Sequence, residues 1–155
     1  MQQKTNIRAE EGAQQLLITR DFDLPVELLF RAYAEPALVA QWMGTTVLKM
    51  ESRKHGSYQF ETTDALGNVV FRASGVIHEF IPSQKITRTF EMENAPFGVQ
   101  LELLSFEPRT PGTSHLAMHV VYESTASRDQ LLRLPFAQGL NSAHTRLQRV
   151  MNSLQ

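Results

Sequence analysis

Six consecutive segments between Thr45 and Tyr122 alternate apolar and polar residues with a period of two, and this pattern constrains the fold more than any other feature. Such alternation is typical of β-strands that bury one face. In the clearer segments the apolar positions are Leu48, Met50, Tyr58, Phe60, Ile86, Phe90, Met92, Val99, Leu101, Leu103, Leu116, Met118, Val120 and Tyr122. The remaining segment, Val69–Phe80, is apolar on both sides in places, which indicates a central strand or one bulged near Gly75.

Short connections separate these segments, and they are rich in Gly, Pro, Asn and Asp, as in DALGN at 64–68, ENAPFG at 93–98 and PRTPGT at 108–113. These residue types suit tight turns. A parallel crossover needs a dozen residues or more, so connections this short predict neighbouring antiparallel strands. The apolar positions are expected to face the core.

One strand precedes this region. Leu16–Asp23 alternates, with Leu16, Ile18 and Phe22 on the same side. Arg20 shares that side, which places a charge on an otherwise apolar face.

Two short helices are expected next. Pro25 suits a first helical turn, and the apolar residues that follow it are spaced as one stripe. These residues are Val26, Leu29, Phe30 and Tyr33. Pro36 begins the second helix, Gly44 is a natural stop, and Trp42, the only tryptophan of the chain, lies near its end.

The C-terminal region is predicted to be helical. Ser127 and Gln130 fit a capping box, and Pro135 should break or restart the helix. Beyond it, apolar residues recur at steps of four and three: Phe136, Leu140, Ala143, Leu147, Val150 and Leu154. Gly139 lies inside this long amphipathic helix, where glycine is unfavourable, so we expect it to approach the sheet or a pocket closely.

The order of elements predicts an α+β fold, in which a curved seven-stranded antiparallel sheet surrounds the long C-terminal helix. Only this helix is long enough to cover the apolar face of the sheet. At 155 residues the chain is expected to be one domain, with a flexible leader over residues 1–15 and a single folded domain over residues 16–155.

Composition excludes several classes of function. The 15 basic and 16 acidic side chains nearly cancel, which argues against a nucleic-acid partner. The chain has no cysteine, no signal-peptide pattern and no apolar run of about 18 residues, so a cytoplasmic protein without a membrane partner is expected. No metal site is predicted, since His115 and His119 would lie about 13 Å apart on one strand.

Four stretches carry a resemblance to a known family: ITRDFDLPVELLFRAYAEPALVAQWMG, HGSYQF, GVIHEFIPSQKITRTFEM and YESTASRDQLLRLPFAQGLNSAHTRLQRVMNSL. From about Leu16 to Leu154 the chain resembles the stand-alone bacterial branch related to the C-terminal domain of the activator of the heat-shock protein 90 ATPase. That branch lies within the START-like (SRPBCC) superfamily, whose fold is called the helix-grip fold. The chain departs from the family at Met43–Thr45 and around Phe136, where the resemblance implies the mouth of a cavity.

The resemblance implies an internal pocket for an apolar or aromatic small molecule, between the C-terminal helix and the sheet. A helix gripped by a curled sheet leaves space near the two short helices, and clefts of this kind are usual ligand sites. The residues expected to bind the ligand are Phe30, Tyr33, Trp42, Met50, Tyr58, Phe60, Phe90, Met118, Phe136, Leu140 and His144. Trp42 is interpreted as a wall shared between core and pocket, and burial wholly within the core is the alternative.

Two other functions stay open. The family name implies a module that contacts a chaperone, although chaperone activators of the family carry a further N-terminal domain. Some relatives in the superfamily catalyse cyclisation or dehydration, and Arg20, His78, Arg88 or His144 could then act as acid or anchor. Salt bridges at a sheet edge are the structural alternative for the two arginines. No catalytic residue and no cofactor are predicted, and a monomer or a homodimer is expected.

Overall fold

The computed structural model describes residues 3–155, which form eight strands and four helices. In chain order they are β1 (Asn6–Arg8), β2 (Gln15–Phe22), α1 (Val26–Ala34), α2 (Pro36–Met43), β3 (Thr46–Met50), β4 (Ser57–Thr63), β5 (Val69–Ile81), β6 (Lys85–Met92), β7 (Val99–Thr110), β8 (Thr113–Val121), α3 (Thr125–Leu132) and α4 (Phe136–Asn152). The strands make one antiparallel sheet in the order β1-β2-β8-β7-β6-β5-β4-β3.

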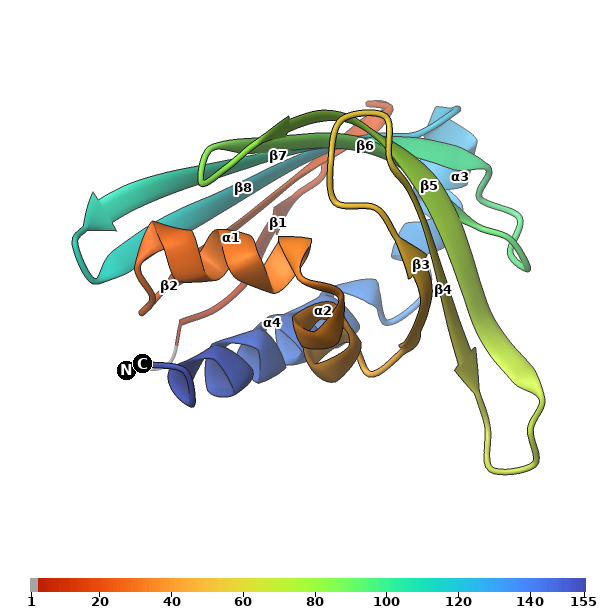
Figure 1. The fold of residues 1–155 in the computed structure, drawn as a ribbon. Coiled ribbons are helices and arrows are strands. Elements are labelled where there is room, and N and C mark those ends of the chain that lie inside the picture. The colour runs from red at the N-terminus through yellow and green to blue at the C-terminus, as the bar shows by residue number, and fades with distance from the viewer. Residues whose placement is uncertain (1–2) are drawn as a thin grey trace.

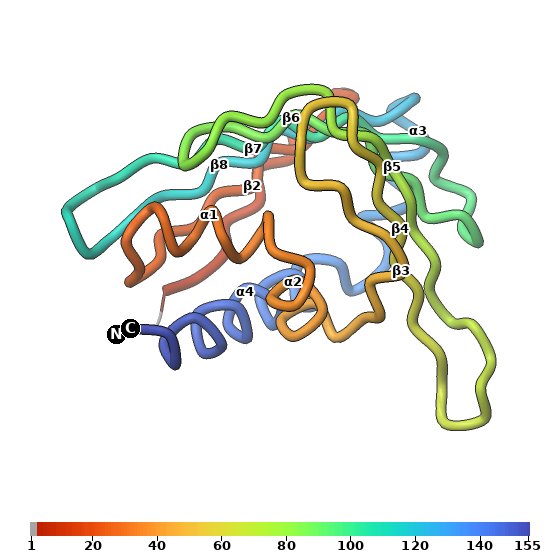
Figure 2. Tube along the Cα trace, in the orientation of Figure 1, coloured from red at the N-terminus to blue at the C-terminus, as the bar shows by residue number. Residues whose placement is uncertain are grey.

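The sheet arches over the helices, with α4 beneath its concave face (Figure 1). Helix α1 lies against β7 and β8, and α2 lies between α4 and β3 (Figure 2). The close backbone contacts of α4 include α1, α2 and α3. The predicted α+β fold with an antiparallel sheet and a long C-terminal helix is therefore confirmed.

The two short helices begin and end where the sequence predicts. Pro25 precedes α1, and Pro36 occupies the first turn of α2, where a missing N–H removes no helical hydrogen bond. Gly44 ends α2 with a φ of 64°, in the left-handed region that glycine adopts without strain. This turn directs the chain straight into β3.

The predicted count of seven strands is wrong, because the sheet has an eighth at its edge. Residues 6–8 form β1, in which Asn6 pairs with Thr19 and Arg8 with Leu17. This strand lies inside the segment predicted as a flexible leader, of which residues 1 and 2 are outside the described residues. Three residues are too few to show a period of two, so the strand depends on its pairing with β2.

Two predictions for the C-terminal helices are also wrong. Ser124, not Ser127, caps α3, because its Oγ accepts a hydrogen bond from the backbone N of Ser127 at 3.0 Å. Gly139 is exposed, and a Cβ added there would have no atom within 4 Å, so this glycine makes no close approach. Pro135 does separate α3 from α4, as its lost hydrogen bond predicts.

The first half of β7 faces the opposite way from the prediction. Val99 and Leu101 are 39% and 38% exposed, whereas Gln100 and Glu102 are 7% and 5% exposed. The pairing with β8 sets this phase, because Glu102 lies opposite Val120 on the buried face. Strand β7 therefore brings two polar side chains under the arch.

Candidate functional site

A cavity of about 250 Å³ lies between the first half of α4 and the concave face of the sheet. Every helix and the strands β2, β6, β7 and β8 contribute to its lining. The lining residues are Ile18, Tyr33, Trp42, Met43, Arg88, Phe90, Met92, Gln100, Glu102, Met118, Val120, Tyr122, Leu131, Phe136, Leu140 and Ala143. Most of them are apolar, and a few polar side chains are grouped on adjacent strands.

The apolar wall combines aromatic rings with flexible side chains. Phe136 and Leu140 come from successive turns of α4, and Met118 faces them from β8. Methionine is unbranched and polarisable, so it adapts to irregular shapes. A wall of this kind accepts a range of apolar molecules.

Trp42 lines the cavity and is also part of the hydrophobic core, which agrees with its interpretation as a wall shared between core and pocket. It is buried, and its ring lies 5.1 Å from that of Tyr33. Its indole Nε1 donates a hydrogen bond of 2.7 Å to the carbonyl of Ala32, so this polar group is satisfied within the protein and does not face the pocket or solvent. Arg146 of α4 donates to the carbonyl of Trp42 at 3.0 Å, which ties α2 to α4.

A buried ion pair forms the polar part of the cavity. Arg88 and Glu102 lie opposite each other on β6 and β7, and Arg88 Nε is 2.8 Å from Glu102 Oε1. Gln100 Nε2 donates to Glu102 Oε2, also at 2.8 Å. The rings of Tyr58 and Tyr33 lie against the guanidinium, with centroids 5.4 Å and 6.0 Å from Arg88 Cζ. The salt bridge expected for Arg88 is therefore present, but it lies in the middle of the sheet and not at an edge.

The electrostatic balance keeps this pair charged and the tyrosines neutral. Burial opposes the charge of Arg88, but Glu102 beside it, together with Tyr58 and Tyr33, raises the pKa of Arg88 above its ordinary value. Burial raises the pKa of Tyr33 and of Tyr122. At pH 7 the cavity therefore presents one cation, one anion and uncharged hydroxyl groups, whose charges sum to zero.

Six of the eleven residues predicted to bind the ligand line this cavity: Tyr33, Trp42, Phe90, Met118, Phe136 and Leu140. The other five do not line it: Phe30, Met50, Tyr58, Phe60 and His144. Phe60 is buried in the core and Met50 packs against its edge. Phe30 packs edge-on against Phe80 and Phe106, with centroids 5.2 Å and 5.1 Å away.

His144 is fully buried next to the cavity rather than in its wall. Its Nδ1 lies 2.8 Å from Thr5 Oγ1, and its Nε2 lies 3.3 Å from Tyr33 Oη. Burial, with a contribution from the charge of Arg20, lowers the pKa of His144 to about 3. The imidazole is thus neutral and held on both nitrogens, which suits a structural role.

Arg20 and His78 are also outside the cavity lining. Arg20 is buried between β2 and α4, where it donates to Asn141 Oδ1 at 3.1 Å, and His78 is exposed on β5. Of the four residues considered as acid or anchor, only Arg88 lines the cavity.

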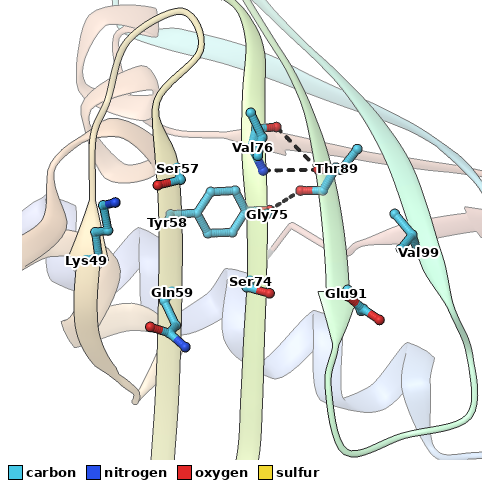
Figure 3. Close-up of a pocket in the computed structure, with 10 residues that line it drawn as sticks. All are labelled: Lys49, Ser57, Tyr58, Gln59, Ser74, Gly75, Val76, Thr89, Glu91 and Val99. Atoms are coloured by element: carbon cyan, nitrogen blue, oxygen red, sulfur yellow. Dashed lines mark hydrogen bonds between the residues drawn. The ribbon is translucent and has the colours of Figure 1, made fainter.

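The side chain of Tyr58 extends across the neighbouring strands and does not line the cavity. Its ring extends from β4 over Gly75 of β5, and its hydroxyl donates to the carbonyl of Thr89 on β6 (Figure 3). A Cβ at Gly75 would meet Thr89 O at 2.0 Å, so only glycine allows this crossing. The same strands bound a polar groove of about 450 Å³, and the helices lie behind them in this view, which places the groove on the outer face (Figure 3).

Sequence reasoning missed Gln100 and Glu102 as cavity residues. The clearer apolar positions of that segment, Val99 and Leu101, belong to the outer face. The signal was present further along β7, where Leu104 and Phe106 share the parity of Glu102 and are buried. Assigning the inward-facing positions of β7 from Leu104 and Phe106 would have predicted that Gln100 and Glu102 also face inward.

Neither a metal site nor a membrane span emerges from residues 3–155. No group of three or more His, Cys, Asp or Glu side chains in that range could hold a metal ion. No helix in the same range is long and apolar enough to cross a membrane.

Comparison with known proteins places the chain in a family and supports the fold. The family model described as "Activator of Hsp90 ATPase homolog 1-like protein" matches residues 23–152. No curated protein sequence matches the chain.

Several solved structures share its fold. A protein from Rhodobacter sphaeroides superposes with a TM-score of 0.85 at 22% identity, covering 97% of this chain and 99% of its own. A protein from Mycobacterium smegmatis gives 0.82 at 19% identity, covering 95% and 96% of the two chains. A protein from Arthrobacter aurescens gives 0.83 at 16% identity, covering 96% and 91%. At these identities the likeness describes the fold alone.

Proposed function

The chain belongs to the family of Activator of Hsp90 ATPase homolog 1-like proteins, and within this family we propose that it binds an apolar or aromatic small molecule between α4 and the sheet. The observation that carries the proposal is the cavity of about 250 Å³ with its mainly apolar wall. An apolar cavity of about 150 Å³ is enough to hold benzene, so this one has room for a fused pair of rings.

The proposal is tested with naphthalene, titrated into the purified protein by calorimetry. Wild-type protein is expected to bind it at one site. Ala143→Phe places a ring into the cavity from α4 and should abolish binding, whereas Ser142→Phe, on the exposed side of the same turn, should leave it unchanged. Failure of the wild type to bind, or equal binding by both variants, would contradict the proposal.

Native mass spectrometry of gently purified protein then addresses the physiological ligand. Extra mass carried by the wild type and by Ser142→Phe, but absent from Ala143→Phe, identifies a molecule held in the cavity. The apolar character of the ligand is a prediction that this measurement tests. A cytoplasmic location is a separate prediction, which rests on the lack of cysteine, of a signal-peptide pattern and of a long apolar run.

Contact with a chaperone remains an alternative that rests on the family description. Stimulation of a purified heat-shock protein 90 ATPase by this chain would favour it. Catalysis in the cavity has less support, because Arg88, the one residue considered as acid or anchor that lines the cavity, is paired with Glu102.

A further inference from the structure

The polar side chains of the cavity are incompletely satisfied. Arg88 makes one hydrogen bond, through Nε, while its two terminal nitrogens find no partner among residues 3–155. The Oη of Tyr122 is buried and also has no partner among these residues. A buried hydroxyl without a partner costs about 1–3 kcal/mol of stability, so its retention calls for an explanation.

These groups lie together. Arg88 and Glu102 are direct neighbours across β6 and β7, and Tyr122 follows β8, which pairs with β7 on its other side. All three line the same cavity, and the charge of Glu102 contributes to raising the pKa of Tyr122, after the larger effect of burial. Unused donors of Arg88, a free hydroxyl and a carboxylate thus meet at one side of an otherwise apolar space.

The charges of this group favour a particular ligand chemistry. A carboxylate ligand would gain from Arg88 but would be repelled by Glu102, and an amine would face the reverse conflict. A hydroxyl group has no such conflict, because it accepts a hydrogen bond with its oxygen and donates one with its proton. It can therefore take a hydrogen bond from Arg88 and give one to Glu102 or Tyr122.

We propose that the cavity selects a neutral apolar molecule bearing a hydroxyl group, and that Arg88, Glu102 and Tyr122 bind this hydroxyl. The inference rests on the proposed function and specifies its ligand class. Gln100 positions Glu102 through its hydrogen bond to Oε2. The apolar wall supplies most of the affinity, and the hydroxyl subsite supplies the selectivity.

Three ligands that share the naphthalene ring system and differ in one substituent test this selectivity: naphthalene, 2-naphthol and naphthalene-2-carboxylate. Their binding is measured by calorimetry at pH 7. The neutral alcohol is expected to bind about tenfold or more tightly than naphthalene, the gain of one or two hydrogen bonds to charged groups. The carboxylate is expected to bind more weakly than 2-naphthol. Equal binding of all three, or tightest binding of the carboxylate, would overturn the inference.

Two variants locate the selectivity. Tyr122→Phe removes only the free hydroxyl and should reduce the preference for 2-naphthol over naphthalene about fivefold. Tyr58→Phe is the matched control, since it removes a buried tyrosine hydroxyl that already bonds to Thr89 and lies outside the cavity lining. Its preference ratio should stay at the wild-type value, and a fall equal to that of Tyr122→Phe would contradict the assignment.

Arg88→Lys provides a second readout in a protein that keeps its charge balance. Lysine can pair with Glu102 but lacks the planar fork of donors, so the preference for the alcohol should fall as well. If naphthalene binds without any preference among the three ligands, the cavity is a binding site but the hydroxyl subsite is wrong. If naphthalene does not bind at all, the proposed function itself fails.

Discussion

The space beneath the arched sheet has two ends that are built differently. One, the packed end, is filled by Phe22, Phe30, Leu104 and Phe106, which are all buried. The other, the hollow end, is bounded by Phe90, Met118, Phe136 and Leu140 around the cavity. Strand β7 runs through both, with apolar side chains facing inward at the packed end and Gln100 and Glu102 at the hollow end.

This difference assigns stability to one end and binding to the other. Aromatic rings at the packed end meet edge to face, as Phe30 and Phe106 do with centroids 5.1 Å apart. At the hollow end, the buried hydroxyl of Tyr122 has no partner among residues 3–155, which costs stability. Proteins retain such costs where they serve a function, so the comparison points to the hollow end.

The largest expected effect is a difference in stability when one aromatic side chain at each end is truncated to alanine. Phe106→Ala should lower the free energy of unfolding by about 3–5 kcal/mol, because it opens a void in close-packed surroundings. Phe90→Ala should cost only about 1–2 kcal/mol, since its ring is half-buried and already faces a cavity. Urea unfolding followed by circular dichroism measures both, and equal losses would remove the distinction between the ends.

Breaking the buried ion pair is the next largest effect. Glu102→Leu leaves Arg88 buried without its partner and should cost about 3 kcal/mol. The double variant Glu102→Leu with Arg88→Met removes both charges and should recover most of that stability, while losing the preference for 2-naphthol. A double variant less stable than Glu102→Leu alone would contradict this account of the pair.

His144, whose ring packs edge-on against Phe22 of the packed end with centroids 5.7 Å apart, should also give a pH dependence. Its pKa is lowered to about 3 by burial and by Arg20, so the folded protein does not take up a proton where the unfolded chain does, below about pH 6.5. Stability contributed by the neutral imidazole is therefore present above that pH and lost as the pH falls. We expect a loss of about 2 kcal/mol between pH 6.5 and pH 5.

His144→Gln should remove this part of the pH dependence, and His78→Gln, at an exposed position, should not. Thermal melts at a series of pH values supply the measurement. A wild-type slope that His144→Gln leaves intact would assign the dependence to other groups.

The smallest expected effect has the opposite sign. Tyr122→Phe removes an unsatisfied buried hydroxyl and should stabilise the ligand-free protein by about 0.5–1 kcal/mol. Tyr58→Phe should destabilise it instead, because its hydroxyl bonds to Thr89. Differential melting of the two variants checks the contrast, and a loss of stability in Tyr122→Phe would show that its hydroxyl is satisfied.

The sequence predicted the elements whose pattern is long. The residues Leu16, Ile18 and Phe22 of β2 are buried as expected, and so are Leu116 and Val120 of β8. Each strand completes several periods with mostly apolar residues on one side, although Arg20 of β2 and Ser114 of β8 are buried with them. The family match over residues 23–152 confirms the resemblance found in the four stretches.

The failures occur where local pattern competes with pairing or with a binding site. Residues 6–8 are too short to show a period, and the polar side chains of Gln100 and Glu102 invert the apparent phase of β7. Of the cavity wall, the aromatic residues were predicted better than the polar ones. The rule that apolar residues face the core does not identify polar side chains, such as Gln100 and Glu102, that line a buried cavity.

The most direct test of the distinction between the two ends is a crystal structure of the protein under xenon pressure, since xenon occupies apolar cavities without needing hydrogen bonds. The account predicts xenon density between Met118, Phe136 and Leu140 and none among the rings of the packed end. Density at the packed end, or an empty hollow end with α4 closed onto β8, would contradict it.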